Sequence, residues 1–247
     1  MENTEQKYDT LGILKKLMLC PYSQTESIDE AEQNLRVLQQ QSENINVLIG
    51  MLFCRIMSGN RKDALDLTQK IWRAGGNLTP FFELLYTDCL INLGETESAK
   101  ILIDPRLKKM PETVNYFYMV FVKYALISGN LALLDQIGDY QDNRQKEKVL
   151  FDFAKKHAYN ESSQHFKILI TTITDIVKDY LCSFEYVMYS DTLELVLYTT
   201  ATPEQNDSLQ QQMELALEKK FAETTLDFDD FSITLEPIST HAPWLEP

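Results

Sequence analysis

Glycine is scarce in this chain, with 8 residues among 247. Loops that hold phosphate groups with backbone amides need several glycines close together, and neither GxxxxGK[ST] nor GxGxxG occurs. The GxSxG pattern of serine hydrolases and the HExxH pattern of zinc proteases are also missing. The sequence therefore offers no specific catalytic motif, and it predicts a protein that is not an enzyme and that carries no cofactor.

Residues that bind metal ions are few and poorly spaced. The four cysteines lie far apart without a CxxC pair, which fits neither a zinc site nor a disulfide framework: Cys20, Cys54, Cys89 and Cys182. His157 and His165 are eight residues apart, so they lack the i, i+4 spacing of a helical metal pair, and we expect them to be solvated linker residues. The acidic run 227–230 has too few ligands and no glycine for a calcium loop. We expect no bound metal.

Long apolar runs and clusters of basic residues are missing as well. No segment approaches the roughly 18 consecutive apolar residues of a membrane span, and the polar start MENTEQKYDT does not resemble a signal peptide. The net charge is −14, and the lysines form only isolated pairs, so the surface repels nucleic acid. We expect a cytoplasmic protein that binds neither nucleic acid nor membranes.

What the chain does contain is a regular glycine spacing. Gly59, Gly94 and Gly129 lie 35 residues apart, and each follows one apolar segment and precedes another. A turn glycine between two helical segments, repeated with a period in the mid-thirties, indicates a helical repeat array. We predict helix pairs on either side of each glycine. Two further helices are predicted before them, over residues 8–20 and 27–41, the second with Ser27 as its N-cap.

These residues resemble the tetratricopeptide-repeat family over roughly residues 8–140. In that family a glycine between the two helices is followed five residues later by alanine, which Gly59 with Ala64 and Gly94 with Ala99 match. The small residue that the family has within its first helix is absent here, since Leu52, Thr87 and Val122 stand there. The resemblance implies stacked helix hairpins that bind a peptide or protein. An ordinary helical bundle with a fortuitous period is the alternative.

Aromatic residues are concentrated in two of the predicted first helices. In a stacked array the first helices form the concave face, where peptides bind. The predicted partner-binding residues are Phe81, Phe82, Tyr86, Tyr116, Tyr118, Phe121 and Tyr124. The competing interpretation places the same side chains in the core between repeats.

The pattern changes at residues 160–163. A helical stripe from Phe166 to Leu181 is followed by two alternating segments, 184–189 and 193–198, with a predicted hairpin turn at Ser190–Asp191. Thr202 with Gln205 predicts a capping box that opens another helix, and residues 231–235 alternate as a third strand. The predicted fold is mainly α with a smaller α+β part. It comprises a helical repeat domain at 1–160 and an α-β-β-α-β domain with a three-stranded sheet at 161–247.

The predicted function is that of a non-enzymatic protein–protein interaction module. Its repeats would bind a protein or peptide as an adaptor, a scaffold or a chaperone for secretion or assembly, and the C-terminal sheet would form a homodimer. Small acidic chaperones built from tetratricopeptide repeats resemble the N-terminal half, although the C-terminal domain departs from their pattern. The alternative is an enzyme or regulatory subunit with its site in the C-terminal domain, where the candidates are Cys182, Glu185, Asp191, Glu194 and residues 227–230.

Overall fold

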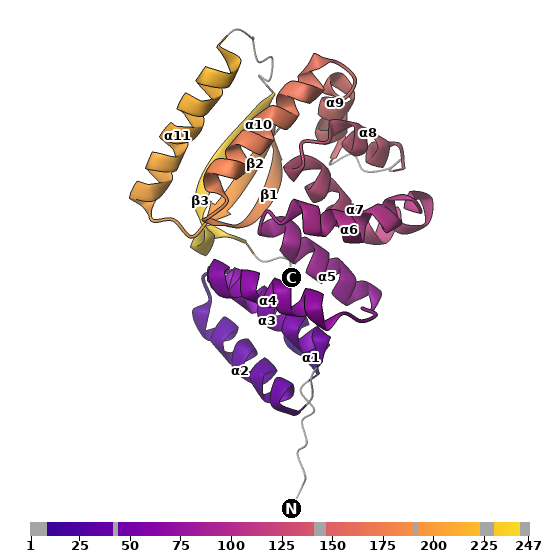
Figure 1. Ribbon diagram of the computed structural model, residues 1–247, viewed down its shortest axis with the longest axis vertical. Coiled ribbons are helices and arrows are strands. Elements are labelled where there is room, and N and C mark those ends of the chain that lie inside the picture. Colours follow the sequence, from indigo (N-terminus) through magenta and orange to yellow (C-terminus); the bar gives the residue numbers. More distant parts are fainter. Residues whose placement is uncertain (1–8, 42–43, 141–146, 190–191, 223–229, 243–247) are drawn as a thin grey trace, which may run out of the picture. The chain divides into compact units, whose positions relative to one another are not determined.

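The computed structural model of the chain describes residues 9–41, 44–140, 147–189, 192–222 and 230–242. It is mainly α-helical with a smaller α+β part around a three-stranded sheet, as the sequence predicts (Figure 1). The chain divides into two compact units, residues 1–86 with 238–247 and residues 87–237. The domain boundary predicted after residue 160 lies inside the second unit. That residues 1–160 and 161–247 fold as separate domains remains a prediction.

The helices that precede the sheet follow the predicted segments closely. They are α1 (Thr10–Leu17), α2 (Thr25–Gln41), α3 (Ile45–Met57), α4 (Arg61–Ala74), α5 (Pro80–Asn92), α6 (Thr96–Leu107), α7 (Met110–Ile127), α8 (Leu131–Asp139), α9 (Lys148–His157) and α10 (Glu161–Val177). One predicted start is wrong. Ser27 lies inside α2, because the helical hydrogen bonds already begin with the N–H of Ile28 donating to the carbonyl of Gln24 at 3.2 Å.

The three predicted turn glycines are confirmed. Gly59, Gly94 and Gly129 follow α3, α5 and α7 with φ of 70°, 75° and 65°, a backbone region that favours glycine. After each glycine, the next N–H donates to the carbonyl five residues earlier, which is the bond of a Schellman motif. These bonds run from Asn60 to Arg55, from Glu95 to Leu90 and from Asn130 to Ala125, each at 2.8 Å. The 35-residue period of the sequence thus corresponds to one turn geometry used three times.

A buried polar cluster connects α5 and α7 within the second unit. The ammonium group of Lys123 lies 2.8 Å from Oδ1 of Asp88 and 2.5 Å from Oδ1 of Asn92. Asn92 also donates to Asp88 at 2.9 Å, and the Lys123 ammonium lies 5.1 Å from the centre of the Phe184 ring. Asp88 and Lys123 are 35 residues apart, so they occupy equivalent positions in successive first helices. Both ionic groups are buried and paired, which is the condition for tolerating charge in a core.

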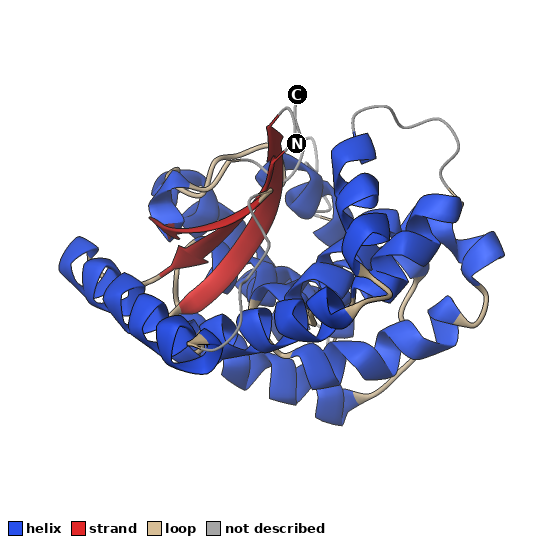
Figure 2. Ribbon diagram, turned by 90° about the horizontal axis from the view of Figure 1, so that it is seen from above, coloured by secondary structure: helices blue, strands red, loops and turns tan. Residues whose placement is uncertain are grey.

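The sheet of the second unit contains β1 (Leu181–Tyr189), β2 (Thr192–Thr199) and β3 (Phe231–Pro237) in the order β1-β2-β3. β1 and β2 are antiparallel, whereas β2 and β3 are parallel and connected through α11 (Pro203–Phe221). The predicted order α-β-β-α-β and the capping box of Thr202 with Gln205 are confirmed. The turn predicted at Ser190–Asp191 lies outside the described residues. Figure 2 shows the three strands as one twisted layer among helices.

One face of the sheet is apolar and packs on helices. Leu193, Leu195 and Leu197 of β2 are buried on this face, and Leu193 pairs with Phe231 of β3. The Phe231 ring lies 5.1 Å from Phe166 of α10 and 5.8 Å from Phe153 of α9, between ring centres. α11 contacts α10 and β3. The alternating pattern of the strands therefore fixes which face joins the aromatic core of this unit.

The segment after β3 belongs to the first unit. Residues Ile238–Thr240 form a single 3-10 turn, and the ring of His241 then stacks on Tyr22 with 4.1 Å between ring centres and 10° between planes. The N–H of Tyr22 also donates to the carbonyl of His241 at 3.3 Å. Both side chains are buried. The first unit is therefore made of two stretches of chain that are distant in sequence.

Candidate functional site

The structure places most of the seven predicted partner-binding residues in the core. Five of them are buried, namely Phe82, Tyr86, Tyr118, Phe121 and Tyr124. Two of their hydroxyl groups are used inside the fold, since Tyr86 donates to the carbonyl of Thr68 at 3.1 Å and Tyr118 donates to the carboxylate of Glu147. Phe81 is partly exposed, and Tyr116 is 49% exposed. The partner-binding prediction therefore rests on Phe81 and Tyr116.

Tyr116 belongs to an exposed strip on α7 that the sequence reasoning identified only in part. Four exposed residues, Glu112, Asn115, Tyr116 and Met119, follow one another at helical spacing, and we name them the α7 surface. Met119 is 48% exposed, and its sulfur lies 3.7 Å from the hydroxyl of Tyr186 on β1. Its position one helical turn after Tyr116 is the signal that could have identified it. An exposed tyrosine and methionine side by side provide apolar area on an otherwise polar helix face.

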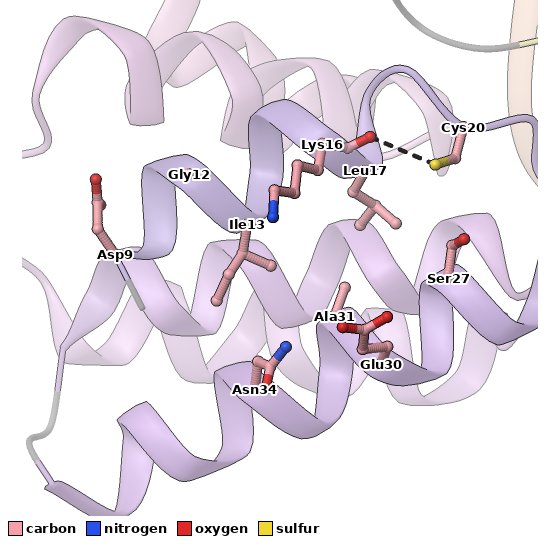
Figure 3. Close-up of a pocket in the computed structure, with 10 residues that line it drawn as sticks. All are labelled: Asp9, Gly12, Ile13, Lys16, Leu17, Cys20, Ser27, Glu30, Ala31 and Asn34. Atoms are coloured by element: carbon pink, nitrogen blue, oxygen red, sulfur yellow. Dashed lines mark hydrogen bonds between the residues drawn. The ribbon is translucent and has the colours of Figure 1, made fainter. Parts of the chain in front are cut away.

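A groove lies between α1 and α2 in the first unit, and we name it the α1–α2 groove (Figure 3). Its volume is about 420 Å³, within the range of about 300–1,000 Å³ typical of ligand pockets. The lining residues are Asp9, Gly12, Ile13, Lys16, Leu17, Cys20, Ser27, Glu30, Ala31 and Asn34. Ile13, Leu17 and Ala31 are buried, so the groove has an apolar floor with polar side chains around it.

Three polar side chains of the groove make no side-chain hydrogen bond or ion pair among the described residues. Lys16 stands on α1, whereas Glu30 and Asn34 stand on α2. Asp9 differs, because its carboxylate accepts the N–H of Leu11 at 2.8 Å as the N-cap of α1. The groove thus presents a cation on one wall and an anion on the other.

The candidate residues of the enzyme alternative are not arranged as a catalytic site among the described residues. Cys182 is buried, and Asp191 with residues 227–229 lies outside the described residues. Glu185 accepts a hydrogen bond from Tyr198, and Glu194 accepts one from Thr234. Burial and then the Glu185 hydrogen bond raise the pKa of Tyr198 well above its usual value, so this phenol stays a donor.

Neither of the two histidines expected in a solvated linker lies in one. His165 is a partly exposed residue of α10 whose ring centre lies 5.8 Å from that of Phe221. His157, expected as a solvated linker residue, is buried on α9 with its ring 4.8 Å from that of Phe153. Its Nε2 lies 3.6 Å from Oδ1 of Asp230, whose other oxygen pairs with Lys156 at 3.1 Å. Phe153 lies four residues before His157 on the same helix, so the helical spacing is a signal that could have indicated this burial, whereas Asp230 comes from a distant part of the chain. No group of three or more His, Cys, Asp or Glu among the described residues is arranged to hold a metal ion.

The four cysteines are free thiols, and only Cys20 is partly exposed. Burial, with a smaller contribution from the charge of Glu32, raises the pKa of the Cys54 thiol to about 12. Because the thiolate is the reactive form, we expect Cys20 to react with an aromatic disulfide reagent at pH 8, while the three buried thiols react only after unfolding. Mass spectrometry of labelled peptides measures this. Rapid labelling of Cys54 in the folded protein would contradict the packing of α3.

No family model, curated protein or solved structure matches this chain. None of the helices in the described ranges combines the length and apolar character that crossing a bilayer requires. The interpretation of function therefore depends on the two surfaces described above and on the fold that presents them.

Proposed function

We propose that this chain is a non-enzymatic interaction protein whose helical repeats bind a protein partner through the α7 surface. The observation that carries the proposal is the exposure of Tyr116 and Met119, 49% and 48%, on a helix whose other sides are buried. Tyrosine is enriched among residues that dominate binding energy, and methionine adapts its shape to varied apolar partners. A partner that covers both side chains removes apolar area from water.

The repeated turn geometry supports an array of the tetratricopeptide type. Three Schellman turns at one period each separate two helices, and at two of these turns, α3 with α4 and α7 with α8, the two helices contact each other as in a hairpin. The equivalent position to Tyr116 one period earlier is Phe81, which is partly exposed. Phe81 belongs to the first unit and Tyr116 to the second, so the proposal rests on the α7 surface alone. An adaptor, a scaffold or an assembly chaperone each binds its partner through a surface of this kind.

The rest of the proposal concerns place and assembly. Four free thiols and a net charge of −14 suit a reducing cytosol. β1 and β3 are the outer strands of the described sheet, so either offers an edge for pairing with a second copy. In the partner experiment below, light scattering of the purified chain reports whether it is a dimer.

The test is affinity capture by the full tagged chain from cytosolic lysate of its source cells, quantified by mass spectrometry. We expect a dominant partner whose retention falls at least about tenfold with Tyr116→Ala combined with Met119→Ala, since residues that dominate interfaces each cost about 2 kcal/mol or more. The matched control is Leu215→Ala, which removes another exposed apolar side chain, 65% exposed, from the second unit. Equal retention by the double variant and the control would exclude the α7 surface as the binding site.

A further inference from the structure

We propose that the α1–α2 groove is a second binding site and that its ligand is an amphipathic helix of a partner protein. The groove lies in the first unit and shares no residue with the α7 surface of the second unit. A helix placed in such a groove inserts side chains spaced three and four residues apart. Ile13 and Leu17, themselves four residues apart on α1, form the apolar floor with Ala31 of α2.

Gly12 indicates that another backbone approaches here. Glycine inside a helix costs about 0.5–1 kcal/mol relative to alanine, so its presence needs a reason. The fold supplies none, because a Cβ atom at Gly12 would meet nothing within 4 Å, and the residue has no positive φ. Gly12 is one of the residues that line the groove, so the absence of a side chain there leaves the α1 side of the groove low. A docked helix explains the missing side chain, since only a small residue allows close approach of a second backbone.

The charges of the groove define the flanks of this helix. Figure 3 shows Lys16 on α1 reaching into the space between the helices, with Asn34 and Glu30 projecting toward it from α2. The carboxylate of Asp9 points away from α2 in the same view. Lys16 and Glu30 are both exposed and, among the described residues, unpaired. The complementary ligand therefore has an apolar stripe with an acidic flank along α1 and a basic flank along α2.

The test uses three synthetic helical peptides with the same leucine stripe, whose flanks carry glutamate and lysine, lysine on both sides, or glutamate on both sides. Binding to the full chain is measured by fluorescence anisotropy. We expect the mixed peptide to bind wild type about three- to fivefold more tightly than either uniform peptide, as each exposed ion pair contributes modestly. Lys16→Glu should then prefer the lysine peptide, and Glu30→Lys the glutamate peptide. The mixed peptide binds in whichever of its two directions places glutamate along α1, and each uniform peptide has two identical flanks. The comparison therefore does not depend on the direction in which the helix lies.

Two variants distinguish specific binding in the groove from non-specific binding of the peptides. Lys15→Glu makes the same charge change on α1 at an exposed residue that does not line the groove, and it should leave the peptide preference unchanged. Gly12→Leu should reduce binding of the mixed peptide at least about tenfold while thermal unfolding stays unchanged or moves upward, because open space surrounds that position.

Four results would overturn the proposal. They are no binding of the mixed peptide at millimolar concentration, equal binding of all three peptides, a Lys15→Glu effect equal to that of Lys16→Glu, and self-association that Gly12→Leu abolishes. The last would assign the groove to a second copy. Tyr116→Ala with Met119→Ala should bind the peptides as wild type does, so failure here and failure of the α7 surface are distinguishable.

Discussion

Gly129→Ala is expected to destabilise the protein by about 3 kcal/mol or more, through two costs that add. The residue has φ of 65°, where a side chain strains the backbone. Its Cβ would also lie 2.6 Å from the Cα of Lys167 on α10, and backbone cannot move aside as a flexible side chain can. The third glycine turn is thus both a chain reversal and a contact surface. Urea unfolding followed by circular dichroism measures the loss.

Gly94→Ala is the matched control, because it changes the equivalent residue one period earlier. Its φ is 75°, so the backbone strain is similar, but the added Cβ would meet only a side-chain carbon of Leu181 at 3.4 Å. We expect a loss of about 1–2 kcal/mol, that of the strained conformation alone. If the two variants lose the same stability, then the close approach of α10 to the turn at Gly129 is wrong.

Lys123→Met is expected to cost about 3–5 kcal/mol, because it leaves the carboxylate of Asp88 buried without a cation. Asp88 is 1% exposed, and among the described residues its carboxylate keeps in this variant the hydrogen bond from Asn92. Methionine retains the length of the lysine chain, so loss of packing contributes little. Urea unfolding at pH 7 measures the change in the midpoint and in the free energy of unfolding.

A second substitution tests whether the buried charge is the cause. Combining Lys123→Met with Asp88→Asn removes both charges and allows the new amide to pair with Asn92. We expect this double variant to recover most of the stability lost in Lys123→Met, since replacing both partners of a buried ion pair is often neutral. If the double variant is less stable than Lys123→Met, then the unpaired charge of Asp88 is not the cause of the lost stability.

Local rules explain why much of the fold was predictable. A glycine that ends a helix, a Thr202–Gln205 capping box and an alternating strand each depend on residues close in sequence, and the structure confirms all three. The predicted start of α2 was wrong because serine is a preferred N-cap residue, whereas the helical hydrogen bonds begin at the carbonyl of Gln24. Sequence pattern alone locates the start of a helix only to within a few residues.

The candidate sites were less predictable, because exposure depends on partners distant in sequence. Tyr116 and Tyr118 are two residues apart, but only Tyr118 packs in the core with its hydroxyl on Glu147. The helical period separates their faces, but it does not say which face the neighbouring helices will cover. The α1–α2 groove was missed entirely, since its charged residues look like ordinary solvated positions until the two helices are placed together.

The pairing of Tyr22 with His241 has a consequence for synthesis on the ribosome. α1 to α4 leave the exit tunnel first, and a domain that is continuous in sequence would fold at that point. Here the stacking partner of Tyr22 is translated only after residues 87–237 have been made. The newly made helices of the first unit therefore expose the surface around Tyr22 to solvent until His241 is translated. The whole second unit emerges during that interval. Ribosome-bound chains of increasing length should gain full protease resistance in the first unit only once His241 has emerged.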